Sequence, residues 1–379
     1  MNETTSKQIS IITRITAIAC LASMFLCYKL WLSHGPFPLS PISVLLPKIT
    51  HPFDLVLFGI TLISLLCISM FRNPQKYIIV FLFLGLILAL SDQNRWQPWF
   101  FQYVMMFFVL SFFNNTNNDL KYQNAIITIL KLMVGAIYFW SGLQKLNPHF
   151  LADTFPWLME PLTDHLGAGS MSHFKLLGYA FPLIESAAGV ALFIKPIQKK
   201  AVVLILLMHL FILFVIGPLG HNYNPGVWPW NCAMMSLVVI LFYRNNHFNF
   251  SSIKSAWSYH SIKIVFVIFI MLPLFNFFNL WDSYLSHNLY SGNTSNGVIY
   301  ISNHIKAKLP DSIKPYAIGD FNQNQITIKY WCMQELGVPA YPEKRNFEAI
   351  TRFFYKYAND SAEVYLMYTP KLKLSEFQY

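Results

Sequence analysis

A lysine lies at the end of one long apolar stretch of this sequence, where a charge is costly. The segment 134–151 reads V-G-A-I-Y-F-W-S-G-L-Q-K-L-N-P-H-F-L, and Lys145 follows a helix-length run that contains one other charge, Lys131. A desolvated lysine becomes partly neutral, and a neutral amine can act as a base or form a Schiff base. The alternative is a lysine whose long stem carries the ammonium to the lipid headgroups. The spacing allows both interpretations, and Pro148 ends the helix in either case.

Two further ionisable residues lie inside apolar segments and are candidate catalytic residues. Glu185 lies near the middle of its segment, where a carboxylate must be protonated, paired or hydrogen-bonded. The small residues from Ser186 to Gly189 favour an alternative in which Glu185 makes a polar contact between closely packed helices. His209 interrupts another apolar segment. It is either a site residue or a histidine satisfied by an interhelical hydrogen bond.

Three residues in predicted loops are candidates for binding a cofactor. Asp92 and Arg95 occupy a polar segment that we expect on the same side of the bundle as Lys145. They either line a pocket there or form a surface ion pair of little energetic value. His221 follows the segment of His209 in a Gly- and Pro-rich loop, a pattern also typical of an ordinary turn before an interfacial tryptophan. Because no other ligand stands at suitable spacing from the two histidines, we predict no metal site.

Long apolar segments must position these residues, and they predict a multi-pass membrane protein. Hydrophobic residues make up 55% of the chain and charged residues 12%. A bilayer core of about 30 Å requires roughly 20 mostly apolar residues per helix. We therefore predict an all-α polytopic membrane bundle over residues 1–282, with about nine spans. The segments are about 10–32, 54–71, 77–91, 98–113, 124–145, 174–194, 200–219, 227–243 and 260–281.

Basic residues in the loops predict the orientation of this bundle, since lysine and arginine resist translocation. With a cytoplasmic N-terminus, the inner side carries Lys7, Arg14, Arg72, Lys76, Lys121, Lys195, Lys199, Lys200, Arg244, Lys254 and Lys263. The outer side carries only Lys29, Lys48, Arg95, Lys145 and Lys175. The net charge of +10 is spread over loops without a stripe of interleaved aromatic residues. We therefore expect membrane lipid as a partner and no nucleic acid.

The sequence after about residue 283 is more polar and its periodicity changes. Alternation over 297–305, 326–332 and 364–368 predicts strands, and the spacing of apolar residues over 343–357 predicts a helix. We predict a small extramembrane α+β domain over residues 283–379. The orientation above makes it extracytoplasmic, where it could bind a peptide or protein partner.

The motif that starts at Tyr138, Tyr-Phe-x-x-Gly-x-x-Lys-Leu, resembles the lysine motif of the vitamin-K-dependent γ-carboxylase-like family, also called the horizontally transferred transmembrane (HTTM) domain. Glu185 with its small neighbours, the helix of His209 and the aromatic segment 227–231 are also similar to this family. The resemblance covers about residues 90–245.

This resemblance implies a helical bundle with chemistry on its external side. A lysine that matches Lys145 would act as the base that starts oxygenation of a reduced quinone, the implied cofactor. The resulting strong base would then allow a peptide glutamate to be carboxylated. The sequence departs from the carboxylases in two places. They have a histidine in the polar segment before the lysine helix, and residues 95–103 have none. They also have two consecutive lysines, whereas here Gln144 precedes Lys145.

Three functions remain open at this point. The first is a quinone-linked membrane enzyme that uses Lys145 as its base, with carboxylase-like or oxidoreductase activity. The second is a non-enzymatic membrane protein that binds or transports a lipid or small solute, or acts as a scaffold. The third follows from the similarity of the Gly-x-x-Lys-Leu helix to membrane redox subunits of the DoxX type.

Overall fold

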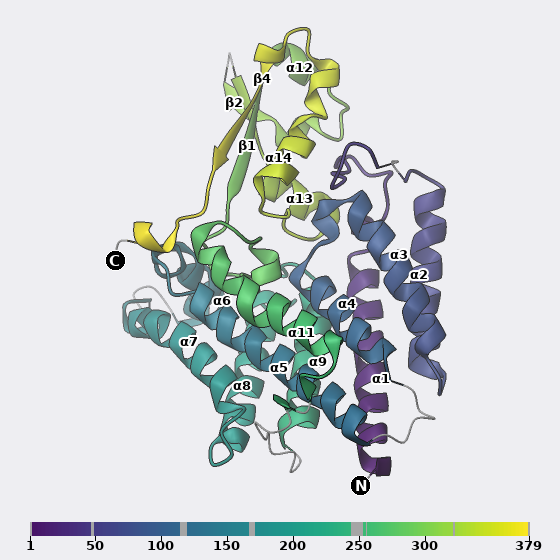
Figure 1. Ribbon diagram of the computed structural model, residues 1–379. Helices are drawn as coiled ribbons and strands as arrows, with labels where there is room; N and C mark the ends of the chain where they lie inside the picture. The colour runs from purple at the N-terminus through teal and green to yellow at the C-terminus, as the bar shows by residue number, and fades with distance from the viewer. Residues whose placement is uncertain are drawn as a thin grey trace.

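The computed structural model describes residues 2–46, 49–113, 120–166, 171–243, 253–254, 256–320 and 323–377. In these residues, helices form a bundle, and a small sheet with its own helices lies at one end of it (Figure 1). Helix α1 (Asn2–Leu26) begins at the end far from the sheet (Figure 1). Lys48 and Arg244, which support the predicted orientation, lie outside the described residues, as does the side chain of Lys175.

Within the described residues, five helical segments are long and apolar enough to cross a membrane. They are Thr5–Leu26 of α1, α2 (Phe53–Met70), α5 (Leu120–Gln144), α8 (Gln198–Ile216) and His260–Phe278, which starts with α11 (His260–Phe266). Shorter apolar helices are α3 (Gln75–Ser91), α4 (Pro98–Ser111), Leu176–Ala191 of α7 (Met171–Ala191), and Val227–Tyr243, which starts with α9 (Val227–Val238). Each predicted span therefore contains a helix, and five of them reach the required length.

Small residues allow α5 and α7 to pack closely beside the site. A Cβ atom added to Gly142 would lie 2.4 Å from Ser186 Oγ, and one added to Gly189 would lie 2.7 Å from the backbone nitrogen of Phe139. The Ser186 hydroxyl donates a hydrogen bond to the Phe139 carbonyl across this contact, at 3.0 Å. The small run after Glu185 thus brings that carboxylate close to α5.

The C-terminal sheet is antiparallel, with strand order β2-β3-β1-β4. Its strands are β1 (Asn296–Ile301), β2 (Ile318–Asp320), β3 (Gln323–Thr327) and β4 (Val364–Thr369), and its helices are α12 (Asn303–Lys308), α13 (Ile328–Leu336) and α14 (Lys344–Thr351). The strand predicted over 364–368 is confirmed as β4. The predicted strand over 297–305 is too long, because the Ser302 side chain caps α12. The strand predicted over 326–332 is confirmed only for Ile326 and Thr327, which end β3, and it is wrong from Ile328 on, where α13 begins.

The sheet region, defined here as residues 296–369, packs on one end of the bundle. Phe37, in the loop after α1, contacts Trp331 of α13 with a ring-centroid distance of 4.6 Å. Asn94 Oδ1 accepts hydrogen bonds from the Tyr341 backbone nitrogen at 3.1 Å and from Asn346 Nδ2 at 2.9 Å. The polar segment between α3 and α4 therefore joins the bundle to the sheet region.

Candidate functional site

A cavity of about 80 Å³ lies between α5, α7, α8, α9 and the segment that follows the last apolar helix. Most of its lining is apolar, with Ile137, Phe150, Phe181, Phe211 and Met234 among the residues. Its polar lining includes Tyr138, Ser141, Lys145, Glu185, His209, Asn231 and His287. A mostly apolar cavity with a few converging polar groups has the character of a ligand or active site.

Lys145 and Glu185 form a buried ion pair on the wall of this cavity. Lys145 Nζ donates to Glu185 Oε2 at 2.9 Å and to Oε1 at 3.1 Å, and it also donates to Ser141 Oγ at 2.7 Å. The two charged residues are only 9% and 7% exposed. Because Lys145 follows the last residue of α5, its side chain can turn back toward α7. The ammonium therefore faces Glu185 and the cavity.

His209 makes two hydrogen bonds, as a donor in one and as an acceptor in the other. Its Nδ1 lies 2.6 Å from Asn231 Oδ1, and its Nε2 lies 2.7 Å from the hydroxyl of Tyr138. Asn231 Nδ2 donates to the Val227 carbonyl at 2.7 Å, which leaves Oδ1 as an acceptor. His209 therefore carries its proton on Nδ1 and accepts the Tyr138 hydroxyl proton at Nε2.

His287 lines the same cavity and was not predicted from the sequence. It is 3% exposed, and its Nε2 atom has no hydrogen-bond partner among the described residues. Burial lowers the pKa of His287 to about 3, so its imidazole is neutral at neutral pH. Its backbone adopts a left-handed conformation with φ of 59°, which is uncommon for a residue other than glycine. A buried polar atom without a partner is costly, so a ligand atom would satisfy it.

Arg95 and Asp92 do not line this cavity, and they do not form a surface ion pair. Arg95 is 1% exposed, and its guanidinium donates to the carbonyls of Leu30, Trp31 and Leu88 at 3.0–3.1 Å. Asp92 Oδ1 accepts from Ser40 Oγ at 2.9 Å. Both residues fasten the loop after α1 to the end of α3. The buried carbonyl groups of that loop need hydrogen-bond donors, and a guanidinium supplies five N–H groups.

His221 also lies outside the cavity that contains Lys145. Its Nε2 is 2.7 Å from the carbonyl of Trp157, and its ring stacks on the Trp157 indole with a centroid distance of 4.2 Å. Trp157 belongs to α6 (Phe155–Leu166). His221 therefore joins the loop after α8 to α6.

A second, open cavity of about 340 Å³ adjoins the first one on the side of the sheet region. Its lining includes Asp153, Trp157, Tyr223, Gly292 and Lys329. The two cavities share Leu289 and Tyr290 in their walls. These two side chains therefore separate the Lys145 cavity from the more open space.

Together, the fold and the site define a helical protein whose apolar helices enclose a buried lysine–glutamate pair. The structure brings Lys145, Glu185 and His209 to one cavity, and it places Asp92, Arg95 and His221 elsewhere. No family model, no curated protein and no solved structure matches the chain. The function is therefore argued from the residues and the geometry of the site.

Proposed function

We propose that this protein is an integral membrane enzyme that removes a proton from a reduced quinone at the Lys145–Glu185 pair. The observation that carries this proposal is the convergence of Lys145, Glu185, His209 and His287 on one largely apolar cavity. Titratable groups gathered in an apolar cavity are typical of catalytic sites. The proposal includes the nine-span topology, with the N-terminus in the cytoplasm and the sheet region outside.

A reduced quinone has the polarity that this cavity requires. Its ring is apolar and matches Ile137, Phe181 and Phe211 in the lining. Its hydroxyl groups need hydrogen-bond partners once water is removed, and the unpartnered Nε2 of His287 can accept from one of them. The cavity of about 80 Å³ is smaller than the cavity of about 150 Å³ that holds benzene in another protein, so a quinone head group enters only if lining side chains such as Leu289 and Tyr290 move toward the open cavity. The isoprenoid tail then leaves between helices.

The ion pair determines which group receives the proton. Lys145 Nζ already donates to both oxygens of Glu185 and to Ser141 Oγ, so its protons are held by these acceptors. The available acceptor is then the Glu185 carboxylate, while the Lys145 ammonium stabilises the quinolate anion that forms. Lys145 and Glu185 share their protons and therefore act as one unit. The alternative assignment, expected from the sequence, is that Lys145 is the base. Dioxygen then oxidises the quinolate by two electrons and takes up its remaining hydroxyl proton together with the proton held by Glu185, which gives quinone and hydrogen peroxide and restores the carboxylate.

Turnover by the purified protein tests this proposal. We expect the protein in lipid nanodiscs to consume dioxygen and reduced quinone together, and Glu185→Gln to lower the rate at least 100-fold. Glu160→Gln is the matched control, because Glu160 is exposed on α6 and outside the cavity. If Glu185→Gln retains the wild-type rate, the proposed chemistry is wrong.

Replacement of the lysine separates the two assignments of the proton acceptor. Lys145→Arg keeps a permanent positive charge but cannot serve as a base. Measurable turnover by this variant assigns the base to Glu185, and complete loss of turnover with intact folding assigns it to Lys145.

The adjoining open cavity favours a second candidate function. Its volume of about 340 Å³ suits a bound lipid or small solute. A protein that binds or transports such a molecule would retain a quinone or lipid through purification without turning it over. Binding without any consumption of reduced quinone would support this alternative.

A further inference from the structure

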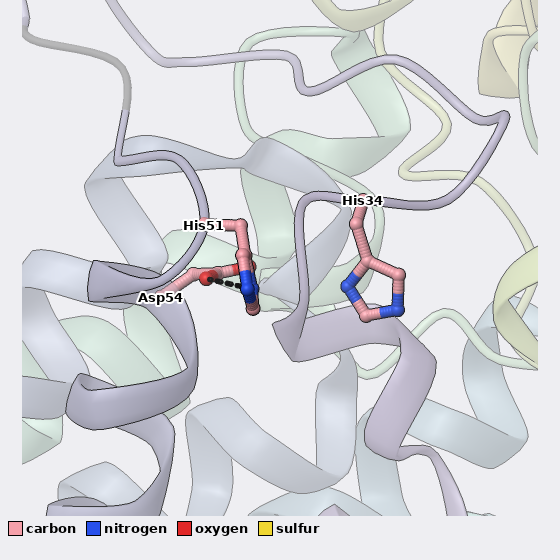
Figure 2. Close-up of side chains that lie close together, drawn as sticks. All are labelled: His34, His51 and Asp54. Carbon is pink, nitrogen blue, oxygen red and sulfur yellow. Dashed lines mark ion pairs between the residues drawn. The ribbon is translucent and has the colours of Figure 1, made fainter.

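A separate cluster of metal-ligating side chains lies at the start of α2. His34 comes from the loop after α1, His51 lies just before α2, and Asp54 lies in its first turn (Figure 2). One ligand atom from each residue lies within 4.8 Å of the other two. The loop between α1 and α2 therefore brings together two imidazoles and a carboxylate that are up to 20 residues apart in the sequence.

The spacing of these atoms suits ligands of one ion better than it suits a hydrogen bond. His51 Nδ1 lies 3.8 Å from Asp54 Oδ1, which is too long for a hydrogen bond. Two ligand atoms about 2.1 Å from one tetrahedral metal ion are about 3.4 Å apart. His34 is exposed, so rotation of its side chain can bring its ring nitrogen to this distance.

Asp54 is already oriented as a metal-ligating carboxylate would be. It is 0% exposed, and its Oδ2 accepts from the Ser33 backbone nitrogen at 2.6 Å and from Ser33 Oγ at 2.8 Å. Its Oδ1 accepts from the Leu55 nitrogen at 2.8 Å and faces the histidines. Hydrogen bonds of this kind fix the ligands of metal sites. Among the described residues, His51 is the only ion-pair partner of Asp54.

The two histidines leave room for a solvent ligand. The rings of His34 and His51 lie edge to face with a centroid distance of 6.0 Å, and both residues are exposed. In the described part of the chain, neither ring has a hydrogen bond to another residue. Their nitrogens are therefore available to an ion, and the exposed side can hold water as a fourth ligand.

We propose that His34, His51 and Asp54 bind a divalent transition-metal ion, for which Zn²⁺ is the best fit. Two imidazole nitrogens and one carboxylate oxygen form a common donor set for zinc, and magnesium and calcium prefer oxygen ligands alone. The ion fastens the loop after α1 to the start of α2. The same loop carries Phe37, which packs on Trp331 of the sheet region, so the bound ion also stabilises that contact. This proposal does not depend on the quinone chemistry at Lys145.

Calorimetric titration with ZnCl₂ tests the site on the full-length protein in detergent. The protein carries an affinity tag without histidine, and chelator treatment followed by dialysis removes bound metal first. We expect one Zn²⁺ per chain in the wild type. His34→Ala and His51→Ala should each weaken binding at least tenfold. His260→Ala is the matched control, because His260 is an exposed histidine at the start of α11, and it should bind zinc as the wild type does.

Thermal unfolding with and without ZnCl₂ gives a second readout of the same variants. Zinc should raise the unfolding temperature of the wild type and of His260→Ala, but not that of the double variant His34→Ala/His51→Ala. Both histidines are exposed, so the double variant should unfold at the wild-type temperature in the absence of metal. Equal zinc affinity in the wild type and the double variant, or no zinc binding by the wild type, would overturn the proposal.

Discussion

The ammonium of Lys145 depends on a single carboxylate for its charge balance. Glu185 accepts two hydrogen bonds from Lys145, and Ser141 Oγ accepts the only other side-chain hydrogen bond of this ammonium in the described residues. Removal of one partner from a buried ion pair leaves an uncompensated charge. The stability of the protein and its proposed proton chemistry therefore depend on the same contact.

This dependence predicts a large loss of stability for Glu185→Gln. The variant should lower the free energy of unfolding by about 3–5 kcal/mol, because the buried ammonium loses its counter-charge. Replacing both residues, as in Lys145→Met/Glu185→Leu, should cost less than the single change. Denaturant unfolding in detergent measures both values. A single variant that is no less stable than the double variant would contradict the account.

The Tyr138 hydroxyl is predicted to contribute through His209. Tyr138→Phe leaves the Nε2 of His209 without its donor, and it should cost about 1–3 kcal/mol because that nitrogen stays buried. Tyr179→Phe is the control, since Tyr179 is 53% exposed on α7. The same unfolding assay applies, and equal effects of the two changes would show that the hydrogen bond to His209 is unimportant.

Some residues of the site can be predicted from the sequence and others cannot. Lys145, Glu185 and His209 stand out because they interrupt apolar segments, and the structure does bring these three together. His287 gives no such signal, because it lies in a polar segment among other polar residues. His34, His51 and Asp54 have no recognisable ligand spacing, and only the loop between α1 and α2 brings them together. The expectation of no metal site came from the spacing of possible ligands around His209 and His221 and of the cysteines, and it did not consider this cluster.

At the scale of elements, the contact between α5 and α7 holds the ion pair in place. Gly142→Ala should force the two helices apart, because the new Cβ would lie 2.4 Å from Ser186 Oγ and 2.6 Å from the carbonyl of Pro182. We expect a loss of about 1–3 kcal/mol and reduced turnover. In Gly59→Ala the new Cβ meets nothing within 4 Å, so this control should change stability by less than about 1 kcal/mol. Equal stability of the two variants would contradict the predicted close approach.

Apolar segments predicted the helices well, whereas mixed segments did not predict the shorter elements. Every predicted span contains a helix, because a long apolar run has few other ways to satisfy its backbone. Helix α6 was not predicted, since its sequence mixes acidic residues with Pro156 and Pro161. The alternation over 326–332 was misleading because it runs from one element into the next. Ile326 lies near the end of β3 and Ile328 is the first residue of α13, and both side chains are buried.

At the scale of the whole molecule, buried charges of the sheet region and of the residues just after it contact the segment that follows the last apolar helix. Glu343 Oε1 accepts from the Ser283 backbone nitrogen at 2.8 Å, and Lys371 Nζ lies 3.4 Å from Ser283 Oγ. Arg345 forms an ion pair with Asp282 beside them. Burial raises the pKa of Glu343 and lowers the pKa of Lys371 to about 8. We therefore expect the docking of the sheet region to depend on pH.

The Lys371 pKa predicts how stability changes above neutral pH. Between about pH 8 and pH 10 the unfolded chain keeps the lysine proton while the folded chain loses it, so this residue makes stability rise with pH. Lys371→Met should remove this rise and should be more stable than the wild type near pH 7, where the buried ammonium is costly. Unfolding at several pH values measures the effect. Lys308→Met, at an exposed lysine of α12, should keep the wild-type pH dependence. An unchanged profile in Lys371→Met would contradict the assignment.

The overall architecture was predicted more completely than the contact between its parts. Composition and periodicity indicated a helical bundle followed by an α+β region, and both are present. The sequence did not reveal that Asn94 and Phe37 hold the sheet region on the bundle, because each contact joins residues more than 240 positions apart. Long-range polar contacts of this kind leave no local pattern.

The most direct test of the central claim is the ionisation state of a reduced quinone bound to the protein. Anaerobic titration at neutral pH, followed by ultraviolet absorbance, distinguishes the quinolate anion from the neutral quinol. The account predicts quinolate absorbance on the wild-type protein and neutral quinol on Lys145→Met, which lacks the ammonium that stabilises the anion. Neutral quinol on both proteins, or no binding to the wild type, would contradict proton removal by the Lys145–Glu185 pair.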